Sequence, residues 1–154
     1  MKRMIAYLFV LLIVLGVLAS LPLRGVLPEW LAPFTVPYLC AIVGGVGGVI
    51  YCLRGIYLNA CVHDRWDFKW WPWYVIRPVV SVLCGLVSYL FLKAGLLVLD
   101  ASQNPDGNQL GFYALAFIAG LNVDKFIGKI EDLAQATWGI EKSRSSSKNE
   151  EGQK

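Results

Sequence analysis

Hydrophobic and polar residues fall into long blocks along this chain. Residues 4–23 contain no charged side chain, and residues 36–53 contain none either. About twenty apolar residues in a helix cross the hydrocarbon core of a bilayer, which is about 30 Å thick. The two blocks therefore predict two membrane-spanning helices, over 4–23 and 36–53. The first follows Lys2 and Arg3, but its apolar run is long for a signal peptide and no small-residue cleavage pattern follows, which favours a retained span.

Two further apolar blocks predict a third span over 75–99 and a fourth over 110–127. Arg77 and Lys93 lie near the ends of the third, and we expect their long side chains to extend to opposite surfaces of the membrane. The uninterrupted apolar part of the fourth is only fourteen residues, 110–123, which is short for a full crossing. We expect the helix to continue, with Phe126 and Ile127 on the same face.

Composition and charge support this layout. Hydrophobic residues make up 56% of the chain and charged residues 16%, whereas soluble domains are about a quarter charged. If the N-terminus is cytoplasmic, twelve of the fourteen lysines and arginines fall on the cytoplasmic side. This positive-inside bias predicts an integral protein of the bacterial inner (cytoplasmic) membrane, with both termini in the cytoplasm.

The glycine-rich stretch VGGVGGV, residues 43–49, lies in the middle of the second predicted span. It lacks the last glycine of a dinucleotide fingerprint, because Ile50 occupies that position, and no phosphate-loop lysine follows. Wound as a helix, Gly44, Gly47 and Gly48 share one face. Such a face allows close approach of another membrane helix.

Small residues in the other spans repeat this pattern. The third span carries a matching stripe at positions i, i+3, i+4 and i+7, made of Ser81, Cys84, Gly85 and Ser88. We therefore expect the second and third spans to pack together. Pairs of small residues four apart also occur in the first span (Gly16 and Ser20) and the fourth (Ala116 and Gly120), which indicates a packed bundle.

The predicted cytoplasmic loop, residues 54–74, is rich in aromatic side chains. Tryptophan and tyrosine prefer the headgroup level of a membrane, so we expect an interfacial anchor formed by Trp66, Trp70, Trp71, Trp73 and Tyr74. Arg65, Lys69 and Arg77 alternate with them and are expected to meet lipid phosphates. A protein-docking surface is the alternative, and nucleic-acid binding is disfavoured because the loop is short and lies against the membrane.

The same loop contains potential metal ligands: Cys61, His63, Asp64 and Asp67. Cys61 and His63 are only two residues apart and no second ligand cluster exists, so the spacing does not predict a zinc site. No nucleophile paired with a base is evident either. We therefore expect no metal, no cofactor and no enzymatic activity.

Residues 124–140 repeat apolar positions at helical spacing and predict an amphipathic helix. Its polar face carries both acidic and basic residues, so the pattern leaves open whether the apolar face lies on lipid or on protein. The polar, serine-rich residues 141–154 are predicted to be a disordered tail.

The sequence thus predicts an all-α integral membrane protein, a four-helix transmembrane bundle with a C-terminal amphipathic helix, in a single membrane domain of residues 1–140. The small-residue stripes favour a protein that acts by assembly in the lipid bilayer, as a partner subunit or regulatory component, with a second copy or another membrane protein. The alternative is a pore or channel former of the holin or effector kind, although no span shows a polar stripe wide enough to line water.

Overall fold

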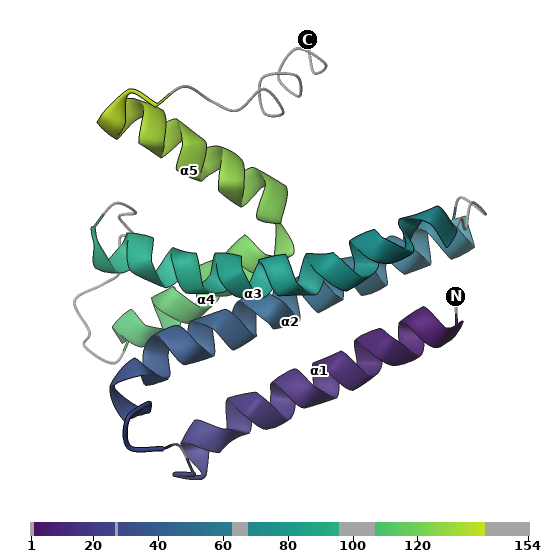
Figure 1. Ribbon diagram of the computed structural model, residues 1–154, viewed down its shortest axis with the longest axis horizontal. Helices are drawn as coiled ribbons and strands as arrows, with labels where there is room; N and C mark the ends of the chain where they lie inside the picture. Colours follow the sequence, from purple (N-terminus) through teal and green to yellow (C-terminus); the bar gives the residue numbers. More distant parts are fainter. Residues whose placement is uncertain (1, 27, 63–67, 96–106, 141–154) are drawn as a thin grey trace.

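The computed structural model describes residues 2–26, 28–62, 68–95 and 107–140, and over these residues it is helical with no strand (Figure 1). The predicted all-α helical bundle is confirmed. Its five α-helices are α1 (Lys2–Leu23), α2 (Thr35–Tyr57), α3 (Trp71–Lys93), α4 (Gly107–Leu121) and α5 (Val123–Trp138). Three single turns complete it: the 3-10 turns η1 (Ala32–Phe34) and η3 (Phe68–Trp70), and the π-helical turn η2 (Leu58–Val62).

Three of the helices are long and apolar enough to cross a membrane. They are α1, the continuous run from Ala32 to Ala60 that contains α2, and α3. A fourth crossing arises only if α4 and α5 are counted together as one bent span. The bounds of α3 differ from the expected span over 75–99, because the helix begins at Trp71 and ends at Lys93. Pro72 in its first turn suits a helix start, and Gly95, with φ of 71°, turns the chain beyond its end.

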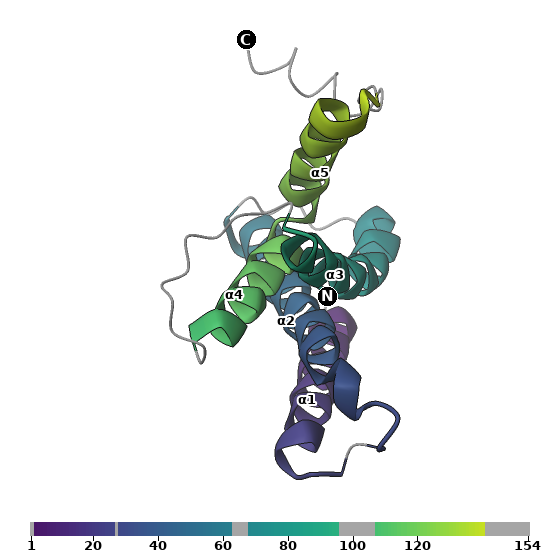
Figure 2. The same cartoon turned by 90° about the vertical axis from the view of Figure 1, so that its left-hand side faces the viewer.

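Helix α2 is the centre of the bundle. It runs antiparallel to α1 and α3, and α4 crosses it on the side away from α1 (Figures 1 and 2). Ten residues of α2 are buried, against three of α1, so α1 packs on the bundle along one narrow stripe. That stripe consists of Met4, Leu8 and Leu15, which pack in one cluster with Val49 and Cys52 of α2.

The chain bends sharply between α4 and α5, and this corrects the expected continuous span over 110–127. Helix α4 ends at Leu121, and Asn122, with φ of −121° and ψ of 53°, leaves the helical conformation. Helix α5 then departs at 110° to α4 (Figure 2). Val123, the first residue of α5, is buried against Cys84 and Ala119, so the bend is packed into the bundle.

Helix α5 ends at Gly139, whose φ of 68° is the left-handed conformation common at helix ends. Its bounds agree closely with the expected amphipathic helix over 124–140. The expected loop over 54–74 is shorter in the structure, because α2 continues to Tyr57, η2 follows, and α3 begins at Trp71. The predicted tail, 141–154, lies outside the described residues.

Candidate functional site

Helices α2 and α3 touch at the level of their backbones. A methyl carbon added to Gly44 would lie 2.7 Å from both the Cα of Gly85 and the carbonyl oxygen of Ser81. One added to Gly48 would collide with the side chain of Ser81. Glycine at these positions therefore sets the separation of the two helices, and the structure brings Gly44 and Gly48 against the stripe that contains Ser81 and Gly85.

Helix α4 makes an equally close crossing on the other side of α2. A methyl carbon at Gly47 would lie 2.6 Å from the carbonyl oxygen of Phe117, and one at Gly120 would overlap the backbone of Gly44. Gly47 thus faces α4, not α3 as the stripe pairing implied. Gly44 is the point at which three helices meet, since it contacts both Gly85 and Gly120.

The other members of the predicted stripe on α3 are also buried, but they have different neighbours. Cys84 packs against Ala119 of α4 and Val123 of α5. Ser88 is fully buried and donates a hydrogen bond of 2.7 Å to the carbonyl oxygen of Gly85 in its own helix. The stripe therefore serves two interfaces, one with α2 and one with α4 and the start of α5.

Ser81 connects the crossing to a polar cluster. Its hydroxyl oxygen lies 2.9 Å from the carbonyl oxygen of Arg77 and 2.9 Å from that of Gly120. The hydroxyl carries one proton, so it donates to one of these carbonyls at a time. Gly120 is in the last turn of α4, where the final carbonyls lack partners within the helix, and Ser81 satisfies one of them across the interface.

The centre of the polar cluster is Arg77, in the second turn of α3. Its side chain is 6% exposed, and Nη1 donates to Oδ2 of Asp124 at 2.8 Å. This corrects two expectations: Arg77 neither extends to the membrane surface nor stands ready for lipid phosphates. It turns inward because Asp124, in the first turn of α5, is placed beside it by the bend at Asn122.

Two aromatic rings complete the arginine cluster, which we define as Arg77, Asp124, Tyr51 and Trp73. The guanidinium carbon lies 4.5 Å from the ring centroid of Tyr51 and 5.3 Å from that of Trp73. Both distances are within the range of cation–π attraction, which strengthens where the cation is shielded from water. The cluster thereby joins α2, α3 and α5 through one side chain.

The arginine cluster is held together by an ion pair and by ring contacts. A guanidinium is a planar fork of N–H donors, so it can hold a carboxylate through charge-assisted hydrogen bonds. The Nε atom of Arg77 is buried and has no hydrogen-bond partner among the described residues. Asp124 is 76% exposed, so the pair extends from the protein interior to its surface.

The predicted aromatic anchor divides into two groups. The side chains of Trp70, Trp71 and Trp73 are exposed, as an interfacial position requires. Tyr74 is only 2% exposed; it belongs to the core, and its hydroxyl accepts a hydrogen bond of 3.3 Å from Asn59 Nδ2. Trp66 lies outside the described residues.

The potential metal ligands of the loop, from Cys61 to Asp67, also have no described side chains, so the expectation of no metal stays a prediction.

Sequence analysis did not predict the arginine cluster. The available signal was the charge of Arg77, two turns inside an apolar helix, a position that in membrane proteins normally has a partner.

Comparison of this chain with known protein families, curated proteins and solved structures gave no match.

Proposed function

We propose that this chain is a multi-pass protein of the bacterial inner membrane that acts by assembly, as a subunit or regulator of a membrane complex. Both termini are in the cytoplasm in this proposal, which rests on the distribution of lysine and arginine along the chain. The helices long and apolar enough to cross a membrane support the location.

The observation that carries the proposal is the open face of α1, which we define as Phe9, Ile13, Gly16, Val17 and Ser20. On the opposite side of α1, Met4, Leu8 and Leu15 pack against the bundle. Gly16 is exposed, and a methyl carbon added to it would have no atom within 4 Å. The glycines at the crossings of α2, α3 and α4 contact other helices of the chain, whereas Gly16 has open space around it. Ser20 is partly exposed, and its hydroxyl donates to the carbonyl oxygen of Val17 in its own helix.

A small-residue face without an internal partner suits contact with another membrane helix, because helix association in lipid depends on close packing. In this proposal the partner is α1 of a second copy of the chain.

The packing of the bundle argues against a pore inside one chain, since the crossings at Gly44, Gly47 and Gly120 leave no space for water. The buried polar side chains of the described residues are Arg77, Ser81 and Ser88, each hydrogen-bonded within the protein.

Assembly can be measured in lipid bilayers by the association constant of labelled copies. The variant Gly16→Leu should weaken association roughly tenfold, which is about 1.4 kcal/mol and within the range of single contacts between membrane helices. Val14→Leu is the matched control, because Val14 is exposed on another side of the same helix. A chain that stays monomeric at all protein-to-lipid ratios, or equal effects of the two variants, would contradict assembly through this face.

The same liposomes test the competing function. Ion or dye leakage at a low protein-to-lipid ratio would favour a pore and overturn the proposal.

The orientation of the chain in the membrane is tested with a membrane-impermeant thiol reagent, which should label Cys61 only from the cytoplasmic side. Cys40, Cys52 and Cys84 are buried and free, so they should react slowly in the folded protein.

A further inference from the structure

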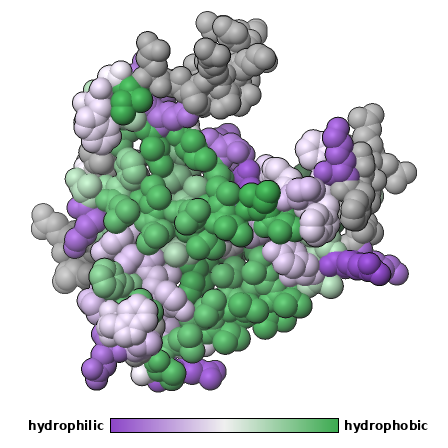
Figure 3. Space-filling model, viewed as in Figure 1, coloured by the Kyte–Doolittle hydropathy of each residue, from purple (hydrophilic) through white to green (hydrophobic). Residues whose placement is uncertain are grey.

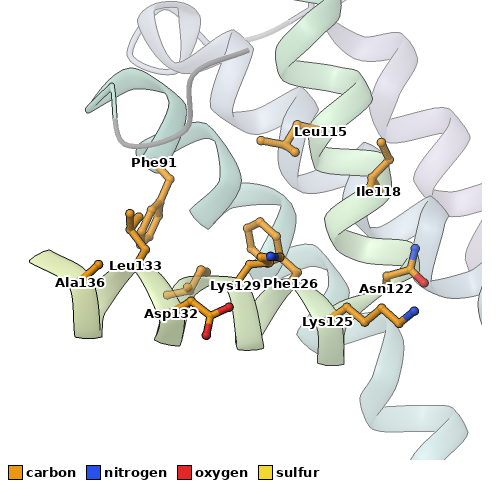
Figure 4. A pocket seen from close by; sticks show the side chains of 11 residues that line it. Phe91, Leu115, Ile118, Asn122, Lys125, Phe126, Lys129, Asp132, Leu133 and Ala136 are labelled. Carbon is orange, nitrogen blue, oxygen red and sulfur yellow. The ribbon is translucent and has the colours of Figure 1, made fainter. Parts of the chain in front are cut away.

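A groove of about 630 Å³ opens between α5 and the pair formed by α3 and α4 (Figure 4). One wall is apolar and comes from the bundle, with Phe91, Leu115 and Ile118. The other wall is the apolar face of α5, with Phe126, Ile130 and Leu133. The volume is within the range of about 300–1,000 Å³ typical of binding pockets for small molecules.

The groove is held open by the bend that precedes it. Helix α5 leaves α4 at 110°, and its first turn is fixed by buried Val123 and by the ion pair of Asp124 with Arg77. Beyond that turn α5 stands away from the bundle (Figure 1). Figure 3 shows that apolar side chains cover much of the face beneath it, so the groove is continuous with apolar surface of the bundle.

The rim of the groove is polar and carries two lysines. Lys125 and Lys129 are one helical turn apart on α5, both are exposed, and both line the opening. Asn122 and Asp132 line it as well, so the charged rim residues leave one net positive charge. An apolar cleft bordered by two ammonium groups is complementary to a molecule with a hydrocarbon chain and a negatively charged head.

We propose that this groove binds one anionic membrane phospholipid. Its acyl chain lies between Phe126, Ile130 and Leu133 of α5 and the apolar wall of the bundle, and its phosphate meets Lys125 and Lys129. Both walls of the groove are apolar, so a hydrocarbon chain can pack against them along its length. A free phosphate ion would satisfy only the lysines, whereas a lipid satisfies the rim and the walls together.

The proposal is independent of assembly through α1, because the groove and the open face of α1 share no residue. It answers the question that the amphipathic pattern left open: the apolar face of α5 lies on a lipid chain, and it does so against the wall of its own bundle. Lysines next to an anionic membrane surface each contribute about a 5.5-fold factor in affinity, so the pair should contribute about thirtyfold.

The test is native mass spectrometry of the full chain in detergent, titrated with phosphatidylglycerol or with phosphatidylcholine of the same acyl chains. We expect one phosphatidylglycerol to bind more tightly than phosphatidylcholine. The variant Lys125→Gln/Lys129→Gln should weaken phosphatidylglycerol binding about thirtyfold. The control Lys2→Gln/Arg3→Gln also removes two positive charges, but at the start of α1, and should leave the affinity for phosphatidylglycerol unchanged.

A second variant tests the apolar part of the site. Ile118 is exposed on the bundle wall, so Ile118→Trp should fill the groove and abolish lipid binding without unfolding the protein. Equal affinity for the two lipids, an equal loss in the control variant, or unchanged binding by Ile118→Trp would overturn the proposal. Displacement of the lipid by millimolar inorganic phosphate would show a simple anion site instead, and would also overturn it.

Discussion

A single methyl group added at Gly44 should destabilise the bundle, whereas the same group at Gly16 should not. The methyl carbon of Gly44→Ala would lie 2.7 Å from the Cα of Gly85. Carbon atoms prefer a separation of about 3.5–4.0 Å, so α2 and α3 must move apart by roughly 1 Å at their crossing. The movement also pulls Gly44 from Gly120, because α4 touches the same residue from the other side.

The magnitude follows from two opposing effects. Overpacking of a tight interior costs about 1–3 kcal/mol, and replacement of glycine by alanine within a helix returns up to about 1 kcal/mol. The backbone contacts at Gly44 cannot relax by a side-chain rotation, so we expect the upper part of the cost and a net loss of about 2 kcal/mol. Gly16→Ala has only the favourable effect, because nothing lies within 4 Å of the added carbon.

The assay is thermal unfolding of both variants in the same detergent, followed by helical circular dichroism. A difference of about 2–3 kcal/mol between the variants corresponds to roughly 4–12 °C in Tm for a chain of this size. The wild-type value should lie between them or equal that of Gly16→Ala. If Gly44→Ala unfolds at the same temperature as Gly16→Ala, the close crossing of α2 and α3 does not exist in the molecule.

Four further variants test the arginine cluster and the core. Asp124→Ala leaves the charge of Arg77 buried without its carboxylate and should cost about 1–3 kcal/mol, reduced from the cost of a fully buried pair because Asp124 is mostly exposed. The double variant Arg77→Met/Asp124→Ala should recover part of this loss in a double-mutant cycle of unfolding free energies; strict additivity would mean that the pair is not coupled. Tyr74→Phe should cost about 1 kcal/mol, the value of its hydrogen bond with Asn59, whereas Tyr74→Ala should cost about 3–5 kcal/mol; equal losses would contradict its place in the core.

Those features that depend on nearest neighbours along the chain were predictable. Uncharged runs revealed α1, α2 and α3, because the length of a span is a local property. The glycine face of α2 was also recognisable, since Gly44, Gly47 and Gly48 share one side of any helix. The helix that each glycine contacts could not be predicted, because the pattern of small residues is alike on α3 and α4. In the structure Gly47 faces α4.

The bend at Asn122 and the burial of Arg77 depend on contacts that the local pattern does not contain. Apolar positions continue at helical spacing across Asn122, so periodicity extended the fourth span to residue 127, whereas α4 ends at Leu121 and α5 begins at Val123. Arg77 lies near the end of an apolar run, where a surface position is the usual outcome. Its partner is 47 residues away, and only the bend brings it near.

The ion pair also joins two segments that are synthesised at different times. Arg77 is synthesised 47 residues before Asp124, so α3 emerges with a charge two turns inside it and no carboxylate to meet it. Until the first turn of α5 has been made, the hairpin of α2 and α3 holds this cation against the rings of Tyr51 and Trp73 but without a carboxylate, which is costly in hydrocarbon. The first turn of α5 therefore supplies the counter-charge that the hairpin of α2 and α3 lacks.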